Sequence, residues 1–405
     1  MRKTICAGLS IALILGSFGM AFAADNDAGA GESNAGEPAA NGQITEQAAG
    51  TMEFTGEAKE LSLEAAIKIM TTEGPGYQEA ELVKEGYEAA SKGQSELLTS
   101  LKEANVALGG SGLPKTTTVK TAQRDRDFYK ALAPVQFQAD LNGLESQAIS
   151  TYYGVLQAED YLKVSKEDLQ AKKDILNNVN KKFNVGMASK VEVMSAESNV
   201  TNAENAVEQA ESALKSAKMS LNIQMGFDLM QNVTLTDKLV RVEAPALDLA
   251  KDIESAKKNR VEIMSAKYAL ESAEADLLSI EVRYPKSSAT YKTKKIAVEK
   301  AQKGYNDALQ GIEMEIRTKY MGLVDGEKAI KVAEETVANA EEAYRIAKLT
   351  YEAGMNTLVD VQSAQIAVNQ AQMAVSKAIV DYDLAVYAYK YAKGAGASGG
   401  SAAGM

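Results

Sequence analysis

The sequence predicts an all-α protein built from two copies of a long helical hairpin, with little or no β-structure. Three observations predict this fold: a helix-forming composition between two stretches of small residues, long segments without proline, and an internal repeat. A proline in a helix interior costs about 3 kcal/mol, so the proline-free segments 135–244 and 286–393 have room for long helices.

The two ends of the chain differ in composition from its middle. A basic start, a short apolar run and an Ala-Phe-Ala ending are typical of a secretory signal peptide over residues 1–23. A transmembrane anchor is the alternative, but it needs about 20 apolar residues, and glycines interrupt this run too early. Residues 24–55 and 394–405 are small or polar, which predicts a disordered linker and a flexible tail.

The residues that carry most catalytic and metal chemistry are scarce in this chain. It has 405 residues, no histidine, and a single cysteine, Cys6, which lies in the predicted signal peptide. An imidazole base, a thiol nucleophile and a zinc cluster are therefore excluded from the mature chain. No paired acids lie in an apolar setting, so we expect no enzyme, no catalytic residues, no cofactor and no bound metal. A net charge of −11 without a basic cluster also argues against nucleic-acid binding.

Heptad-like spacing in the last segment predicts a helix packed on two sides. From Leu358 to Tyr389, apolar or neutral residues recur at alternating steps of three and four, which is typical of a coiled coil. A row of alanines from Ala364 to Ala388 runs beside them and would let a second helix approach closely. Packing on two sides fits a tube or sheet of helices, and a buried helix in a compact bundle is the alternative.

The internal repeat defines the two copies. The segment KFNVGMASKVEVMSAE (182–197) aligns without gaps on TYEAGMNTLVDVQSAQ (350–365), an offset of 168 residues (350 minus 182). The copies are expected to occupy residues 56–244 and 245–393. A weaker pairing of residues 61–75 with 247–261 has an offset of 186 (247 minus 61), so the first copy is longer by about 18 residues. We expect this extra length in the Gly- and Pro-containing stretch 109–134.

Each aligned segment has the pattern of a tight turn between two helices. Gly186 and Gly354 permit the left-handed conformation that often ends a helix. Three residues later comes a hydroxyl residue that can cap the next helix, and an acid three residues beyond it completes a capping box. These residues are Ser189 and Glu192 in the first copy and Thr357 and Asp360 in the second. Plain helix capping is one interpretation of the two acids, and a role at a functional tip is the other.

Three segments resemble the TolC-family outer-membrane efflux proteins, namely LSLEAAIKI (61–69), NRVEI (259–263) and YEAGMNTLVDVQSAQ (351–365). The resemblance extends over roughly residues 57–393. It implies a homotrimer in which each chain contributes two hairpins to a hollow α-barrel. It also implies an exported protein of the outer membrane or periplasm, whose hairpin tips meet a periplasmic adaptor and an inner-membrane pump.

The same resemblance assigns a role to the turn residues. Gly186 and Gly354 would be the tip turns, and Tyr351 and Asp360 would lie where family members close the entrance. Asn356 stands where some members have a basic residue that helps to hold the tip shut, so this chain departs from the family at that position. The complete set of tip or entrance residues is Phe183, Gly186, Ser189, Glu192, Tyr351, Gly354, Asn356, Thr357 and Asp360.

A second departure concerns the strands that the resemblance implies in each half. A membrane strand has about 9–11 residues alternating between apolar and polar, and residues 109–134 and 285–300 show no such run. Residues 285–300 form a polar patch followed by a helical pattern instead.

Two functions fit the sequence: a passive conduit of a tripartite efflux or secretion system, or a non-transporting coiled-coil spacer of the cell envelope. The matched turns favour the conduit, because a spacer has no use for them.

Overall fold

A computed structural model of the chain describes residues 54–107, 116–243 and 245–398. The predicted signal peptide and nearly all of the predicted linker lie outside these residues. The first half of the described chain contains β1 (Thr55–Leu61), α1 (Leu63–Thr72), α2 (Pro75–Ala107), α3 (Thr116–Asn184), α4 (Lys190–Met225) and β2 (Gln231–Leu235). The second half contains α5 (Leu249–Asn259), α6 (Val261–Glu281), α7 (Ala289–Glu352) and α8 (Leu358–Ala392). The all-α prediction with little β-structure is confirmed, and the exact division between the two repeats stays a prediction.

Helix boundaries repeat with the two offsets found in the sequence. α1 and α5 begin 186 residues apart (249 minus 63), and so do α2 and α6. α3 and α7 end 168 residues apart (352 minus 184), and α4 and α8 begin at the same offset. Local signals set several of these starts: the Ser62 side chain caps α1, and Pro75 opens α2, where a missing N–H has no cost.

Most of the extra length of the first copy lies in α2, which ends at Ala107, so its predicted place in 109–134 is largely wrong. α2 has 33 residues against 21 in α6, and α3 has 69 against 64 in α7. α3 also continues through Pro134, and so begins before the proline-free segment 135–244 that was predicted to have room for a long helix. Leu132 and Ala133 are buried next to that proline, so tertiary packing outweighs its local cost.

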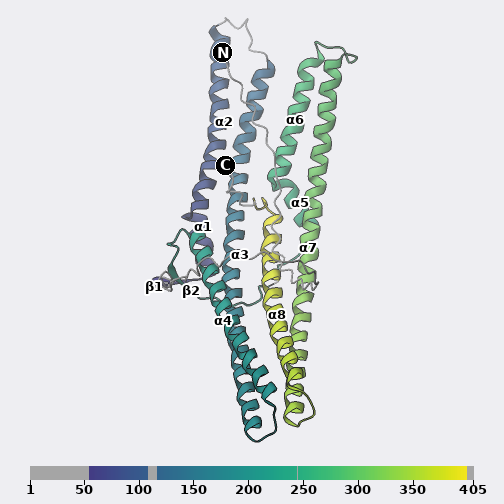
Figure 1. The fold of residues 1–405 in the computed structure, drawn as a ribbon. Helices are drawn as coiled ribbons and strands as arrows, with labels where there is room; N and C mark the ends of the chain where they lie inside the picture. Colours follow the sequence, from purple (N-terminus) through teal and green to yellow (C-terminus); the bar gives the residue numbers. More distant parts are fainter. Residues whose placement is uncertain (1–53, 108–115, 244, 399–405) are drawn as a thin grey trace, which may run out of the picture. The chain divides into compact units, whose positions relative to one another are not determined.

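The two stretches where the family resemblance implied strands are mostly helical in their described parts, and residues 285–288 form a turn. α3 already begins at Thr116, and α7 begins at Ala289. α2 and α3 pack as an antiparallel pair, and so do α6 and α7, as Figure 1 shows. None of the helices in the described ranges is both long and apolar enough to cross a membrane.

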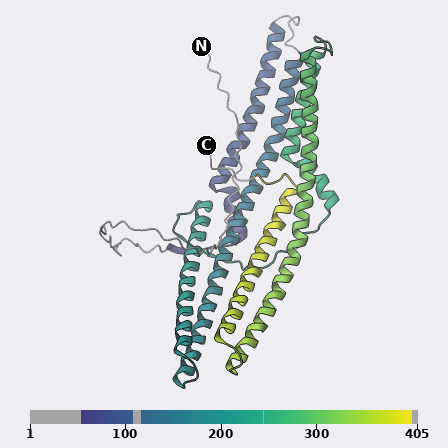
Figure 2. The ribbon, with the colours of Figure 1, turned by 45° about the vertical axis from the view of Figure 1, so that its right-hand side comes forward.

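Four helices lie side by side in the order α4, α3, α8, α7 (Figures 1 and 2). α4 packs on α3 within the first hairpin, α8 packs on α7 within the second, and the contact between α3 and α8 joins the two. α2 extends this arrangement beside α3, and α6 lies between α3 and α7 and contacts both, beyond the end of α8. The result is a sheet of helices in which α4 and α7 form the two edges.

The predicted two-sided packing of α8 is found, but one of its two sides differs from the prediction. The 3-4 row is buried or half-buried throughout; Val361, Tyr382 and Tyr389 are its most enclosed members. The alanine row is not a contact surface along its length, since Ala367 and Ala374 are exposed. α3 meets both apolar and polar groups of α8: Val380 and Tyr391 pack in a cluster with α3, the Asn369 amide donates to the Asp168 carboxylate at 2.8 Å, and the Ser376 hydroxyl contacts Asp160.

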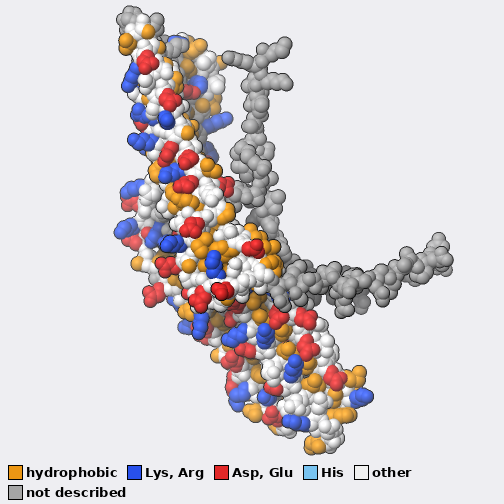
Figure 3. Space-filling model, turned by 90° about the vertical axis from the view of Figure 1, so that its left-hand side faces the viewer, with side chains coloured by type: hydrophobic (Ala, Val, Ile, Leu, Met, Phe, Trp, Pro, Cys, Tyr) orange, Lys and Arg blue, Asp and Glu red, His pale blue; other side chains and the backbone are white. Residues whose placement is uncertain are grey.

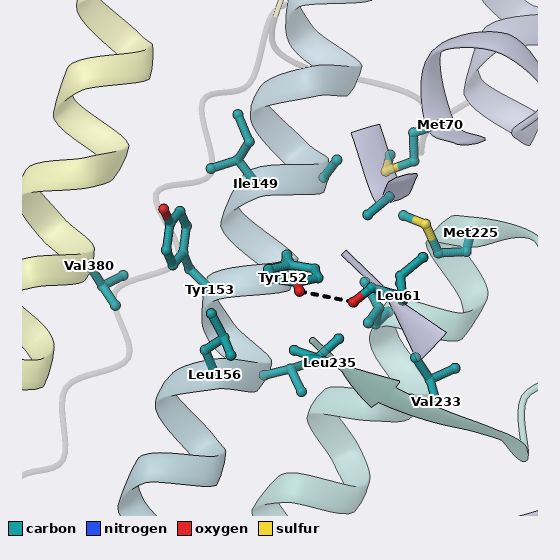
Figure 4. Packing of buried hydrophobic residues seen from close by; sticks show 14 of the residues in the cluster. Leu61, Met70, Ile149, Tyr152, Tyr153, Leu156, Met225, Val233, Leu235 and Val380 are labelled. Atoms are coloured by element: carbon teal, nitrogen blue, oxygen red, sulfur yellow. Dashed lines mark hydrogen bonds between the residues drawn. The ribbon is translucent and has the colours of Figure 1, made fainter. Parts of the chain in front are cut away.

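A hydrophobic cluster holds α1, α3 and α4 around two short parallel strands, which the sequence did not reveal. β1 begins at Thr55, so the predicted linker ends earlier than residue 55, and Leu61 pairs with Leu235 of β2. Tyr152 is completely buried at the centre of this cluster (Figure 4). Its hydroxyl lies 3.0 Å from the Leu61 carbonyl oxygen and 2.8 Å from the Asp237 carboxylate.

The start of the predicted flexible tail packs on α3. The Ser398 N–H donates to the Ala139 carbonyl oxygen at 2.9 Å, and the Asn142 amide donates to the Gly396 carbonyl oxygen at 2.6 Å. Gly396 has φ +88° and lies against the Arg260 guanidinium, where a Cβ would be only 2.9 Å from that group. The small residues of this segment led to the prediction of flexibility, but at Gly396 the lack of a side chain allows the backbone to lie close to Arg260. The prediction is therefore wrong for residues 394–398, and 399–405 lie outside the described residues.

The outer surface of the helices is charged with both signs. Figure 3 shows acidic and basic side chains interspersed over one face, with scattered apolar side chains between them. Many of these charges form pairs four residues apart within one helix, such as Lys303 with Asp307 and Lys377 with Asp381. Exposed pairs of this kind contribute only a few tenths of a kcal/mol each, so helix packing carries most of the stability.

Replacing Tyr152 by Phe removes the hydroxyl that joins α3 to the strand pair. The Leu61 carbonyl and Asp237 lose a buried partner, so we expect the free energy of unfolding to fall by about 1–3 kcal/mol. Urea denaturation followed by circular dichroism measures this change. Tyr161→Phe, at an exposed position of the same helix, is the matched control and is expected to leave stability unchanged; equal effects of the two variants would contradict this account.

Candidate functional site at the paired hairpin turns

Both hairpin turns have the same backbone geometry. In the first, the Met187 N–H donates to the Lys182 carbonyl at 2.8 Å, and the Gly186 N–H donates to the Phe183 carbonyl at 2.9 Å. In the second, Met355 donates to Thr350 at 2.9 Å, and Gly354 donates to Tyr351 at 3.1 Å. These are the two bonds of a Schellman motif, which requires a left-handed residue, and the glycines have φ +75° and +74°.

The predicted capping boxes are present at the starts of α4 and α8. The Ser189 side chain accepts from the Glu192 N–H at 3.2 Å, and the Glu192 carboxylate accepts from the Ser189 N–H at 2.6 Å. Thr357 and Asp360 repeat this exchange at 3.3 and 3.0 Å. Helix capping is therefore a confirmed role of the two acids, while any further role at an entrance stays a prediction.

The capping bonds favour the charged form of the second acid. Hydrogen bonds from Thr357 lower the pKa of Asp360 below its ordinary value. A carboxylate with a lowered pKa stabilises the folded state above the pKa it has when unfolded, and that contribution is lost as pH falls through the folded pKa. The cap is thus complete at neutral pH.

A cation from the first hairpin brings the two turns together at the same end of the helices. The Lys182 ammonium lies 3.7 Å from the centre of the Tyr351 ring and donates to the Tyr351 carbonyl oxygen at 3.2 Å. Beneath this contact Val179 of α3, Ala196 of α4 and Leu358 of α8 form a small buried cluster. Figures 1 and 2 show both turns at the lower end of the ribbon.

The other predicted entrance residues differ in their surroundings. The Tyr351 hydroxyl is buried without a hydrogen-bond partner in the described part of the chain, and burial, with Glu192 nearby, raises its pKa. Asn356 donates to the Thr350 hydroxyl at 3.2 Å and so stays within its own turn. Phe183 is exposed and joins no cluster of described residues. Sequence reasoning missed Lys182, although it stands directly before Phe183 in the repeat.

Apolar side chains project from both turns at equivalent positions. Met187 is 80% exposed and Met355 is 75% exposed, and the exposed Val191 and Val359 follow at the same spacing in each copy. Methionine is flexible and adapts to irregular partner surfaces, and clustered exposed apolar side chains mark interaction sites. The two turns together form what we call the turn surface: Met187, Val191, Met355 and Val359.

Replacing both turn glycines by alanine tests the left-handed geometry alone. Apart from the neighbouring residues, no atom lies within 4 Å of where a Cβ would stand at Gly186 or Gly354, so any loss comes from the backbone. Each alanine should lower the free energy of unfolding by about 1–2 kcal/mol. The matched controls are Gly304→Ala and Gly311→Ala, in equally open positions inside α7.

These controls should raise the free energy of unfolding by about 0.5–1 kcal/mol, because alanine is the better helix residue. Urea denaturation of all four variants measures the difference. The same sign of change at the turns and inside α7 would contradict the geometry described.

The sequence matches one family model over part of its length. Residues 283–388, which include α7 and most of α8, match the model described as Outer membrane efflux protein. No curated protein matches the chain.

Solved structures of outer membrane channels share the fold at low sequence identity. The outer membrane protein VceC from Vibrio cholerae is 13% identical with a TM-score of 0.64, over 82% of this chain and 96% of VceC. The CmeC outer membrane channel of Campylobacter jejuni is 14% identical with a TM-score of 0.62, over 84% and 86%. The MtrE outer membrane channel of Neisseria gonorrhoeae, solved in its open state, is 14% identical with a TM-score of 0.61, over 82% and 89%. The chain thus has the fold of the TolC-family outer-membrane efflux proteins and matches the family model over residues 283–388, which confirms the predicted resemblance.

Proposed function

We propose that three copies of this chain form a passive helical conduit through which an energised pump expels small molecules or peptides. The observation that carries this proposal is the sheet order α4, α3, α8, α7, with both hairpin turns at one end. The similar channel structures support it. As in those proteins, we place the chain outside the cytoplasm, in the outer membrane or periplasm.

The edges of the helical sheet support assembly into a ring. Among the four helices α4, α3, α8 and α7, each edge helix packs on one other, α4 on α3 and α7 on α8, so each has a flank left for a neighbour. Edge α7 exposes apolar side chains along its length, including Met314, Met321 and Val332. Contacts of α7 with α4 of the next chain are head-to-tail contacts, and they form a closed ring when the rotation from one chain to the next divides a full turn evenly. The family resemblance leads us to expect three chains in this ring.

We assign the turn surface to the docking of a periplasmic adaptor, followed by an inner-membrane pump. Its exposed methionines and valines suit the apolar face of partner helices. Lys182 and Tyr351 hold the two turns of one chain together, so releasing this contact would let the hairpins separate and widen the entrance. Some family members have a basic residue where this chain has Asn356, and Lys182 thereby takes over the role of that residue.

The alternative is a non-transporting spacer of the cell envelope. The continuous helices at the starts of α3 and α7, where the resemblance implied strands, favour this alternative. The turn surface favours the conduit, because a spacer gains nothing from two equivalent apolar turns.

We expect the purified protein to be a trimer. Light scattering coupled to size exclusion measures the molar mass, which for a trimer is three times the 43.2 kDa of the full chain, less any cleaved segment. The mass should not change on dilution across the working range, since closed rings bury both edges of each chain. A monomer at all concentrations would exclude the ring.

Polar substitutions in the turn surface separate conduit from spacer. The double variant Met187→Gln and Met355→Gln should weaken adaptor binding by about thirtyfold and reduce export, because each exposed methionine contributes on the order of 1 kcal/mol at an interface. The matched control is Leu82→Gln with Val106→Gln, at exposed positions of α2 far from the turns.

Export of a pump substrate from cells and binding of the purified adaptor are the two readouts. The control pair should keep both, provided that the trimer is intact by light scattering. Unchanged export in the turn variant, and in Gly186→Val with Gly354→Val, would favour the spacer.

A further inference from the structure

The turn between α6 and α7 exposes apolar and aromatic side chains to solvent. Val282 is 95% exposed, and Leu278 lies one helical turn before it and is exposed as well. Tyr284 follows in the turn, and Ile296 is exposed about two turns into α7. These side chains form what we call the α6–α7 surface: Leu278, Val282, Tyr284 and Ile296.

A local excess of positive charge surrounds this surface. Residues 281–295 contain five basic residues and one acidic residue, in a chain with 44 basic and 55 acidic residues overall. The five are Arg283, Lys286, Lys292, Lys294 and Lys295. The expectation of no basic cluster is therefore wrong at this place. The acidic excess of the whole chain conceals this local group of basic residues.

Three of these five cations have an acidic side chain within 4 Å, and two have none in the described part of the chain. Only Lys294 has a close acidic partner, Asp276 at 2.6 Å, while Lys286 and Lys295 lie 3.9 and 3.6 Å from Glu281 and Glu299. Arg283 and Lys292 form no ion pair with any described residue. Both are exposed, so their charge is available to a partner.

The turn presents these groups on a defined backbone. The Ser288 N–H donates to the Pro285 carbonyl at 2.8 Å, and the Ser288 side chain caps α7 by accepting from the Tyr291 N–H at 3.2 Å. The turn's combination of a tyrosine, aliphatic side chains and unpaired cations is typical of surfaces that enter the headgroup layer of a lipid bilayer.

We propose that the α6–α7 turn docks on the surface of an anionic lipid bilayer. Arg283, Lys286 and Lys292 contact lipid phosphates, while Val282 and Tyr284 enter the boundary between headgroups and acyl chains. Charge complementarity identifies the partner as anionic, and the apolar members identify it as a bilayer and not a soluble polyanion. This contact goes beyond the proposed conduit and stands without it.

The position of the turn suits a separate role. α7 begins at this turn and ends at the second hairpin turn after 64 residues, which is about 95 Å at 1.5 Å per residue. The two ends of one helix therefore carry different surfaces: uncharged methionines and valines at one, and cations with apolar side chains at the other. A protein that bridges a partner and a bilayer needs this separation.

Flotation of the purified protein with vesicles tests the proposal. Vesicles of equal parts phosphatidylcholine and phosphatidylglycerol should carry the protein upward, and vesicles of phosphatidylcholine alone should not. The triple variant Arg283→Gln, Lys286→Gln and Lys292→Gln should lose at least about tenfold in affinity, since each cation near an anionic surface contributes to binding. Raising the salt to about 0.5 M should have a similar effect on the unaltered protein.

The matched control changes the same charge elsewhere. Lys215→Gln, Lys331→Gln and Lys348→Gln, all exposed on α4 and α7, should leave flotation unchanged. Val282→Ser with Leu278→Ser should also weaken it, as insertion requires. Equal loss in both triple variants would show a general charge effect, and full binding by the serine variant would show a polyanion site; either result overturns the proposal. These vesicles contain no adaptor or pump, so failure here leaves the conduit untouched.

Discussion

The two-sided burial of α8 is the constraint on which the rest of the structure depends. One side of this helix packs on α7 and the other on α3, so α8 joins the second hairpin to the first. Val386 and Tyr382 lie in a cluster with α5 and α7, whereas Val380 and Tyr391 lie in the cluster of α1, α3 and α4. A helix with a single apolar stripe would leave two separate hairpins, and no sheet of four helices could form.

Polar groups on α8 then position the connecting segments. The completely buried Asp383 accepts from the Val242 N–H at 2.9 Å, which fixes the connector between β2 and α5 against the helix. Burial raises the pKa of this carboxyl, so its charge is held at some expense of stability. Further along, the Tyr389 hydroxyl donates to Asp252 of α5 at 2.7 Å. Apolar packing gathers the helices, and these directional bonds set the register between them.

Sequence could predict what local signals determine. Gly186 and Ser189 state by themselves where α3 ends and α4 begins, because a left-handed cap and an N-cap need particular residues within a few positions. Contacts between distant residues left no comparable signal. Lys182 meets Tyr351 across 169 positions, and Leu61 pairs with Leu235 in a parallel strand pair whose members show no clear alternation. The prediction for residues 394–398 failed for the same reason, since a glycine-rich composition indicates backbone flexibility but not which distant residues the chain contacts.

The two copies of the turn carry information that neither carries alone. Of the glycines and apolar residues identical in both, the glycines are explained by their backbone, and Val193 and Ala196 by burial or partial burial on α4. Met187 and Val191 have no such explanation, because each is exposed and so is its equivalent in the second copy. Exposure to water gives no reason for methionine to occur at the same surface position in both copies. A partner that meets both turns in the same way would favour it, and two equivalent turns at one end of the helices would present such a partner with a repeated surface.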